Sequence, residues 1–203
     1  VDTPFGNGGS AHRGGGRSGY VDHGHHAGMV LSWFRKDGGY DPDFSHNEDA
    51  ELDHRLTSAG GRIWLESDAR LAYRMRDTLP DLVRQYWRYG QGRGRTIMKH
   101  RMRPRLRQVL PVWNLVFLAA CLMVAPLFPV ALAGPAAYLL ALAATSVVAV
   151  LAMRSPCGLL AGVALAAMHL PWAAGFLTEI LRSRLGKGRR HPRWRRPGGT
   201  VAP

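Results

Sequence analysis

Residues 45–52 read Ser-His-Asn-Glu-Asp-Ala-Glu-Leu and place three carboxylates within four positions. Apolar residues continue from this stretch at helical spacing, and a Gly-Gly pair then supplies a stop. Ser45 or Asn47 can cap the start, and Ser45 together with Glu48 fits a capping box. The sequence therefore predicts a short helix with Glu48 and Asp49 in its first turn, at the mouth of a loop.

The simplest explanation of this acidic turn is electrostatic, because carboxylates near the start of a helix complement the positive end of its dipole. The surrounding sequence favours a functional role, since several short motifs stand in order around the turn. They are Val21-Asp22, Gly38-Gly39-Tyr40-Asp41, Asn47-Glu48-Asp49-Ala50-Glu51-Leu52, Arg62-Ile63-Trp64-Leu65 and Gln85-Tyr86-Trp87-Arg88-Tyr89. None of these motifs is specific alone, but together, and followed by long apolar runs, they form a strong signal.

The ordered set resembles the acceptor-side half of a family 2 glycosyltransferase over roughly residues 21–95. Residues 21–26 and 85–90 are most similar to the succinoglycan-type glucosyltransferases of exopolysaccharide biosynthesis. The resemblance implies an α/β fold class, with the C-terminal, acceptor-side part of a GT-A-like domain followed by α-helical transmembrane segments. The chain departs from the family pattern at Tyr86, where Gln or Arg is usual, and at Tyr89, where Trp is usual.

Transfer of a sugar from a nucleotide donor needs a base, a charge that balances the departing phosphate, and groups that orient the acceptor. Asp49 fits the base, because a carboxylate in a polar cleft is ionised at neutral pH and can reach a hydroxyl. The resemblance places the base at this same position. Glu48 or Glu51 would then orient the base or the acceptor. The predicted catalytic residues are therefore Asp49 and Glu48, with Glu51 as a substrate contact.

The motif at 85–89 supplies further predicted substrate contacts. Arg88 can neutralise pyrophosphate with its planar fork of donors. Trp87 or Tyr89 can stack on a sugar ring, and Gln85 can hydrogen-bond the acceptor. Two simpler explanations stay open: Arg88 can lie on a solvated face or contact lipid headgroups, and Trp87 can anchor the chain at a membrane interface.

Histidines stand before and within the acidic turn, at His12, His23, His25, His26 and His46. A zinc site is one explanation, but catalytic zinc needs three well-placed ligands with supporting partners. Adjacent histidines such as His25 and His26 would point apart on a strand. We therefore expect no metal ligand here and place His25 and His26 in a loop that lines the acceptor pocket. Purely structural histidines are the remaining alternative.

The loop at 6–19 is rich in Gly but carries no phosphate-binding pattern. The family's donor half, with its nucleotide-binding αβ unit and Asp-x-Asp metal motif, does not precede this loop. Asp41-Pro42-Asp43 has similar letters but stands in the turn before the acidic stretch. We therefore expect a longer parent chain, in which residues mostly outside this one hold a divalent cation, Mg²⁺ or Mn²⁺. This chain by itself is expected to be inactive.

Local signals predict several other elements. Thr78, with Asp81 three residues on, predicts the start of a helix that glycines from Gly90 onward should end. A buried strand is expected at 62–65 and a half-exposed strand at 69–74. The apolar run at 29–34 favours a buried strand or a short helix.

Basic residues cluster at 84–107 and 182–196 in a chain of formal net charge +13. Between these clusters lie apolar runs at 110–132, 133–153 and 157–177, each near the ~20 residues that span a bilayer. Binding to nucleic acid would explain neither the apolar runs nor the acidic turn, so membrane lipid is the expected partner. Two cysteines, in or beside these runs, offer no disulfide framework.

The membrane topology carries a conflict. Three spans would place the two basic clusters on opposite sides, whereas basic segments that flank spans are normally cytoplasmic. We favour three spans, with residues 1–108 in the cytoplasm. The alternative is two spans and an interfacial or re-entrant helix around residues 169–172.

The expected organisation is an acceptor-side glycosyltransferase part at 1–108, a membrane part of two to three helices at 109–181 and a basic disordered tail at 182–203. The expected function is a membrane-bound inverting glycosyltransferase of the inner (plasma) membrane. It would transfer a hexose from a nucleotide-sugar donor to a lipid-linked saccharide or growing glycan in exopolysaccharide biosynthesis. The alternative is a non-enzymatic, membrane-anchored interaction subunit whose acidic turn is structural.

Overall fold

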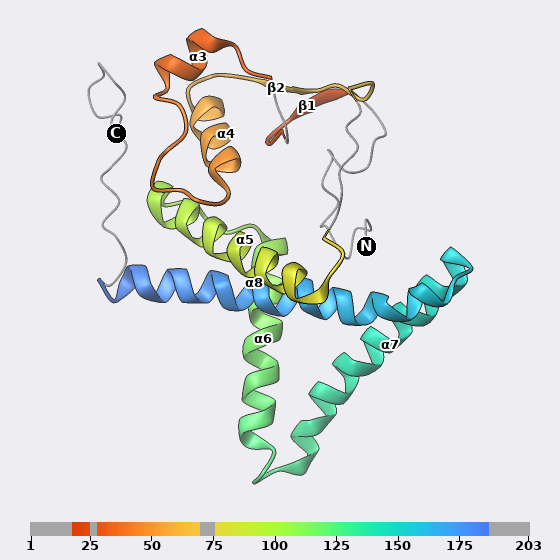
Figure 1. Ribbon diagram of the computed structural model, residues 1–203. Coiled ribbons are helices and arrows are strands. Elements are labelled where there is room, and N and C mark those ends of the chain that lie inside the picture. Colours follow the sequence, from red (N-terminus) through yellow and green to blue (C-terminus); the bar gives the residue numbers. More distant parts are fainter. Residues whose placement is uncertain (1–17, 25–27, 70–75, 187–203) are drawn as a thin grey trace. The chain divides into compact units, whose positions relative to one another are not determined.

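The computed structural model describes residues 18–24, 28–69 and 76–186, which are mostly helical (Figure 1). The elements are β1 (Gly19–Val21), α3 (Leu31–Lys36), α4 (Glu48–Ser58), β2 (Ile63–Leu65), α5 (Leu79–His100), α6 (Leu106–Val124), η1 (Pro129–Leu132), α7 (Ala133–Met153), η2 (Pro156–Leu160) and α8 (Ala161–Arg184). They divide into two compact units. The described part of the first, the apolar unit, is 76–91 and 103–178. The described part of the second, the polar unit, is 18–24, 28–69, 92–102 and 179–186.

The two strands of the polar unit pair antiparallel, with Tyr20 opposite Trp64. Their rings meet edge to face, with centroids 5.0 Å apart. The strand predicted at 62–65 therefore forms as β2, but the prediction that it is buried is wrong, because Trp64 is 53% exposed. The sheet found in the described residues has only these two strands, so the GT-A-like domain stays a prediction.

Two other local predictions have different outcomes. The apolar run at 29–34 contributes to helix α3, and none of the residues of α3 is buried. This outcome selects the short helix over the buried strand. Most of the strand predicted at 69–74 lies outside the described residues.

Helix α4 begins at Glu48, as its apolar spacing predicts, and is followed by Gly60 with a φ of +93°. The predicted capping of its start is wrong. Asn47 occupies the capping position with a left-handed backbone, φ +65°, and makes no side-chain cap hydrogen bond. The Ser45 hydroxyl lies 2.8 Å from Nδ1 of His46 instead. A capping side chain normally reaches the first-turn amides from an extended backbone, and a left-handed residue does not present it in that way.

Helix α5 starts as predicted. Oγ1 of Thr78 donates to Oδ2 of Asp81 at 2.7 Å and accepts from the amide of Asp81 at 3.3 Å. The helix does not end at its glycines, however, but continues to His100. The prediction that Gly90 and the glycines after it terminate the helix is therefore wrong.

These glycines are retained inside α5 because neighbouring backbones approach them closely. A Cβ atom on Gly90 would overlap the carbonyl oxygen of Trp172 within the apolar unit. Within the polar unit, a Cβ atom on Gly92 would lie 2.8 Å from the carbonyl oxygen of His46. Glycine weakens a helix by about 1 kcal/mol relative to Ala, and here close packing on the missing side chain offsets that cost.

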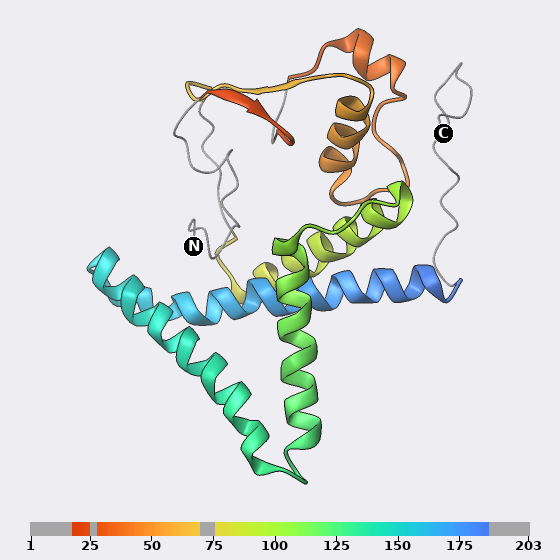
Figure 2. The same cartoon turned by 180° about the vertical axis from the view of Figure 1, so that it is seen from behind.

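The described residues include three helices that are long and apolar enough to cross a membrane. With their flanking turns they cover Leu106–Val124, Pro129–Met153 and Pro156–Arg184, with mean hydropathies of 1.6, 2.2 and 1.6. Helices α6 and α7 meet at η1 and diverge from there, as both views show (Figure 2). The prediction of apolar helices after the acidic region is confirmed at the level of length and composition.

A polar bridge fixes the corner after α7. Oγ of Ser146 donates to the carbonyl of Leu159 at 2.9 Å and accepts from the amide of Gly162 at 2.9 Å. Gly158 permits the backbone of η2 to approach that of Val150, because a Cβ atom there would overlap it. Turn η2 is therefore packed tightly against the end of α7.

Candidate functional site

The acidic turn of α4 rests on Glu51, which has no exposed surface. Its carboxylate accepts hydrogen bonds from Nε of Arg55 at 2.9 and 3.0 Å and from Nζ of Lys99 at 2.7 Å, and it lies 2.8 Å from Nε2 of His100. Burial alone would raise the pKa of Glu51, but the bonds from His100 and Lys99 and the charge of Arg55 hold it at about 2. Glu51 is therefore ionised at neutral pH and ties α4 to the last turns of α5. A contact with the acceptor would need an exposed Glu51 oxygen, which this conformation does not offer.

Arg55 extends this network into the turn that precedes α4. Its guanidinium donates to the carbonyls of Asp37 and Gly39, both at 2.5 Å, and lies 3.1 Å from the Asp37 carboxylate. Lys99 donates to Oδ2 of Asp41 at 2.5 Å. Burial would raise the pKa of Asp41, but the bonds from Lys99 and from a backbone amide lower it. The turn is therefore fixed in position beside the start of α4.

The acidic first turn itself faces His23, which follows β1. Nδ1 of His23 lies 2.6 Å from Oδ2 of Asp53, and the same oxygen accepts the amide of Gly24 at 2.9 Å. The other ring nitrogen of His23, Nε2, lies 4.0 Å from Oδ2 of Asp49. The side chain of Asp53 is 3% exposed and that of Asp49 is 29% exposed. The imidazole of His23 thus lies between the buried carboxylate of Asp53, to which it is hydrogen-bonded, and the partly exposed carboxylate of Asp49.

Sequence reasoning missed this arrangement. Asp53 is not among the residues that the sequence predicts, and His23 is predicted only as one of the loop histidines, without a carboxylate partner. One signal was available, because Asp49 and Asp53 are four positions apart and such residues share a helix face. Their partner His23 lies 30 residues before Asp53, and no local sequence pattern predicts a contact over that separation.

Tyr40 faces the same carboxylates. Burial raises the pKa of Tyr40, and the negative charges of Asp49, Glu48 and Asp53 raise it further. The phenol therefore stays protonated at neutral pH and can donate a hydrogen bond. Tyr40 is 48% exposed, and Glu48 is partly exposed in the first turn of α4. The cluster offers a proton acceptor at Asp49 and a neutral donor at Tyr40.

The predicted substrate residues of the 85–89 motif all lie on α5 in the apolar unit. Nε2 of Gln85 donates to the hydroxyl of Tyr89 at 2.7 Å. The ring of Tyr86 meets that of Tyr89 at a centroid distance of 5.7 Å. Arg88 is exposed and Trp87 is partly buried. The acidic residues of α4 belong to the polar unit, and the predicted acceptor contacts at 25 and 26 lie outside the described residues.

Within the described residues, no three His, Cys, Asp or Glu side chains gather in a way that could hold a metal ion. The Asp41 carboxylate accepts a hydrogen bond from Lys99, and His23 is hydrogen-bonded to Asp53. These groups therefore do not fit the divalent cation that the family resemblance implies. The expectation that its ligands lie mostly outside this chain stays a prediction.

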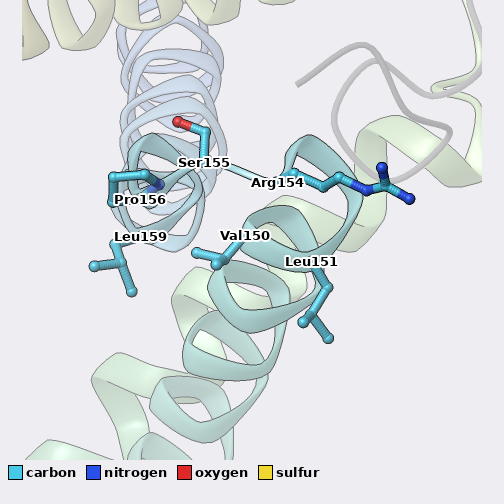
Figure 3. Close-up of a pocket in the computed structure, with 6 residues that line it drawn as sticks. All are labelled: Val150, Leu151, Arg154, Ser155, Pro156 and Leu159. Atoms are coloured by element: carbon cyan, nitrogen blue, oxygen red, sulfur yellow. The ribbon is translucent and has the colours of Figure 1, made fainter.

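An open pocket lies at the corner between α7 and η2 in the apolar unit (Figure 3). It is lined by Val150, Leu151, Arg154, Ser155, Pro156 and Leu159. The lining is mostly apolar and contains no carboxylate. It therefore supplies no group for the proton transfer that the acidic turn suggests.

Comparison with known proteins identifies one curated relative, the succinoglycan biosynthesis protein ExoA of Rhizobium meliloti (strain 1021). The two chains are 43% identical over 180 residues, which is 89% of this chain and 54% of that protein. This chain thus spans about half the length of the curated relative it matches. No family model and no solved structure matches the chain.

The acidic turn, the aromatic motif and the apolar helices occur together in a chain that is related to a succinoglycan biosynthesis protein over 89% of its length. This relationship confirms the resemblance of the motifs to proteins of succinoglycan and exopolysaccharide biosynthesis.

Proposed function

We propose that this chain supplies the acceptor side of a membrane-bound inverting glycosyltransferase of exopolysaccharide biosynthesis. The observation that carries the proposal is the setting of Asp49, which is partly exposed in the first turn of α4 and lies 4.0 Å from a ring nitrogen of His23. The relationship to ExoA supports the reaction class and the pathway. The apolar helices support attachment to the inner membrane.

In the proposed reaction, a hexose passes from a nucleotide sugar to a hydroxyl of a lipid-linked or growing glycan. The Asp49 carboxylate takes the proton of that hydroxyl while the hydroxyl oxygen bonds to the anomeric carbon. The bond from this carbon to the phosphate oxygen breaks, and the nucleoside diphosphate leaves with the electron pair. Attack opposite the leaving group inverts the anomeric configuration.

The other side chains are assigned by their chemistry. Tyr40 donates a hydrogen bond to the acceptor sugar, and Glu48 orients that sugar. His23 is a positioning residue, because Asp53 holds one of its ring nitrogens and the other lies toward Asp49. This arrangement places an imidazole beside the partly exposed carboxylate of Asp49.

The family resemblance supports the roles of the α5 motif. Arg88 is exposed, and its guanidinium is suited to the charge on the departing diphosphate. Trp87 and Tyr89 are suited to stack on a sugar ring, and Gln85 to hydrogen-bond the acceptor. The existing bond between Gln85 and Tyr89 holds these two side chains together before a substrate binds.

The test is Asp49→Asn in the longer parent enzyme, purified in nanodiscs. Asn keeps the size of the side chain but cannot take a proton, so kcat should fall about 10²–10⁴-fold. The KM for the donor should change little, because the base does not contact the donor's phosphates. Asp68→Asn, which alters an exposed carboxylate after β2, is the matched control and should leave kcat unchanged.

An Asp49→Asn enzyme with wild-type kcat would remove Asp49 from the mechanism. The acidic turn would then be a structural feature of the helix start. The melting temperature is measured alongside kcat. Loss of a dipole or capping role would lower the stability of the variant by about 1 kcal/mol or less.

A further inference from the structure

The three apolar helices among the described residues differ in the share of their residues that the rest of the chain buries. In the most apolar stretch of α6, 6% of the residues are buried, and in that of η1 and α7 none is buried. The corresponding value for η2 and α8 is 33%. Helices α6 and α7 therefore present apolar surface all round, as spans surrounded by lipid do. Helix α8 is partly covered by another part of the chain.

One element that covers α8 is α5. A Cβ atom on Gly90 would overlap the carbonyl of Trp172, and a Cβ atom on Gly175 would overlap the carbonyl of Trp87. A glycine on each helix thus lets the two backbones touch. The crossing involves residues 172–176 of α8, roughly 17–23 Å from the start of the helix at 1.5 Å per residue. It therefore lies near the middle of α8.

The crossing part of α5 stands beside charged side chains. Arg88 is exposed and stands two positions before Gly90. Closer to the N-terminus of α5, Arg84 forms an exposed ion pair with Asp81 at 2.7 Å. If α8 crossed the bilayer, its middle would carry this part of α5 into the hydrocarbon, where charged side chains are costly. A helix that lies along the interface keeps the same side chains among water and headgroups.

The opposite face of α8 suits lipid. Val163, Leu170 and Leu177 recur every seven positions, and Leu181 stands one turn further on. At helical spacing these residues share one face, away from Trp172. Val163 is 50% exposed and Leu181 is 55% exposed. An interfacial helix buries such a stripe at the boundary between headgroups and acyl chains.

The charges that flank the helices agree with this placement. Arg103, Arg105 and Arg107 stand before or at the start of α6, and Arg182 and Arg184 lie in the last turn of α8. Two spans return the chain to its original side, so both basic groups lie at the same leaflet. This removes the conflict with the preference of basic residues for the cytoplasmic side, and anionic headgroups there would attract both groups.

We propose that α6 and α7 are the spans and that α8 lies along the cytoplasmic interface of an anionic bilayer, with its Val163–Leu181 stripe toward the acyl chains. This placement replaces the three spans favoured from hydropathy. It is independent of the proposed catalytic role of Asp49.

Cysteine labelling tests the topology. In a chain with Cys121 and Cys157 changed to Ala, single cysteines are placed by Arg103→Cys, Leu127→Cys and Leu185→Cys, all at exposed positions. Spheroplasts are treated with a membrane-impermeant maleimide before or after lysis. We expect Leu127→Cys to react in intact spheroplasts, and the other two only after lysis. Reaction of Leu185→Cys in intact spheroplasts, with Arg103→Cys protected, would establish three spans and overturn the proposal.

A second measurement distinguishes an interfacial from a re-entrant helix. Nitroxide labels are attached at Val163→Cys, Leu170→Cys and Leu177→Cys in nanodiscs of phosphatidylcholine and phosphatidylglycerol. Relative accessibility to oxygen and to a nickel chelate reports the depth of each label. We expect similar, shallow depths at all three sites. A depth that changes steadily along α8 would overturn the interfacial placement, whether the helix spans the bilayer or dips into it.

Discussion

Replacing Glu51 by Gln tests the ionic network beneath the acidic turn. The substitution keeps the size of the side chain but removes the charge that faces Arg55 and Lys99, whose side chains are both 3% exposed. Removing one partner of a buried ion pair costs about 3–5 kcal/mol, because the other charge is left without compensation. We therefore expect the free energy of unfolding to fall by about that amount.

The pKa of Glu51 gives a second, independent magnitude. It is lowered from an ordinary 4.5 to about 2, and each unit corresponds to about 1.4 kcal/mol. Ionised Glu51 thus stabilises the folded chain by about 3 kcal/mol. Because the folded pKa is the lower one, the unfolded chain binds more protons between these values. The contribution is fully present above about pH 4.5 and is lost as the pH falls toward 2.

The assay is urea unfolding of the purified chain in detergent, followed by tryptophan fluorescence at a series of pH values. Glu51→Gln should be less stable at neutral pH and should lack the part of the acid dependence that Glu51 contributes. Asp68→Asn, at an exposed carboxylate, is the control and should stay within about 0.5 kcal/mol of wild type. A Glu51→Gln chain as stable as this control, with an unchanged acid dependence, would refute the assigned role of the network.

Two further substitutions test the close helix crossing and the histidine beside the base. Gly90→Ala should reduce the yield of folded protein and lower its melting temperature, because the new methyl group overlaps the Trp172 carbonyl; Gly28→Ala, which meets nothing within 4 Å, should not. Equal melting temperatures for these two variants would contradict the close crossing. In the parent enzyme, His23→Gln should lower kcat less than Asp49→Asn does, with little change in the KM for the donor. A reduced melting temperature with an unchanged kcat would make His23 purely structural.

Features with short-range causes were accessible from the sequence. The acidic start of α4 follows from the spacing of apolar residues near Glu48, and the start of α5 follows from the pairing of Thr78 with Asp81 three positions on. The apolar helices follow from composition, because a long stretch without charge is suited to the hydrocarbon core. The family motifs also predict Asp49 as the base, because this prediction needs only the residue type and its place in a short motif.

Tertiary structure decided what each of these features packs against. Glu51 stands two positions after Asp49 in the sequence, yet it is buried because Lys99, 48 residues away, approaches it across the fold. His23 is held by a carboxylate 30 residues away. Gly90 does not end α5, because the chain gains close packing where a side chain is absent. Intrinsic propensity and periodicity describe one segment at a time, whereas burial and ion pairing depend on which segments meet, and the whole chain decides that.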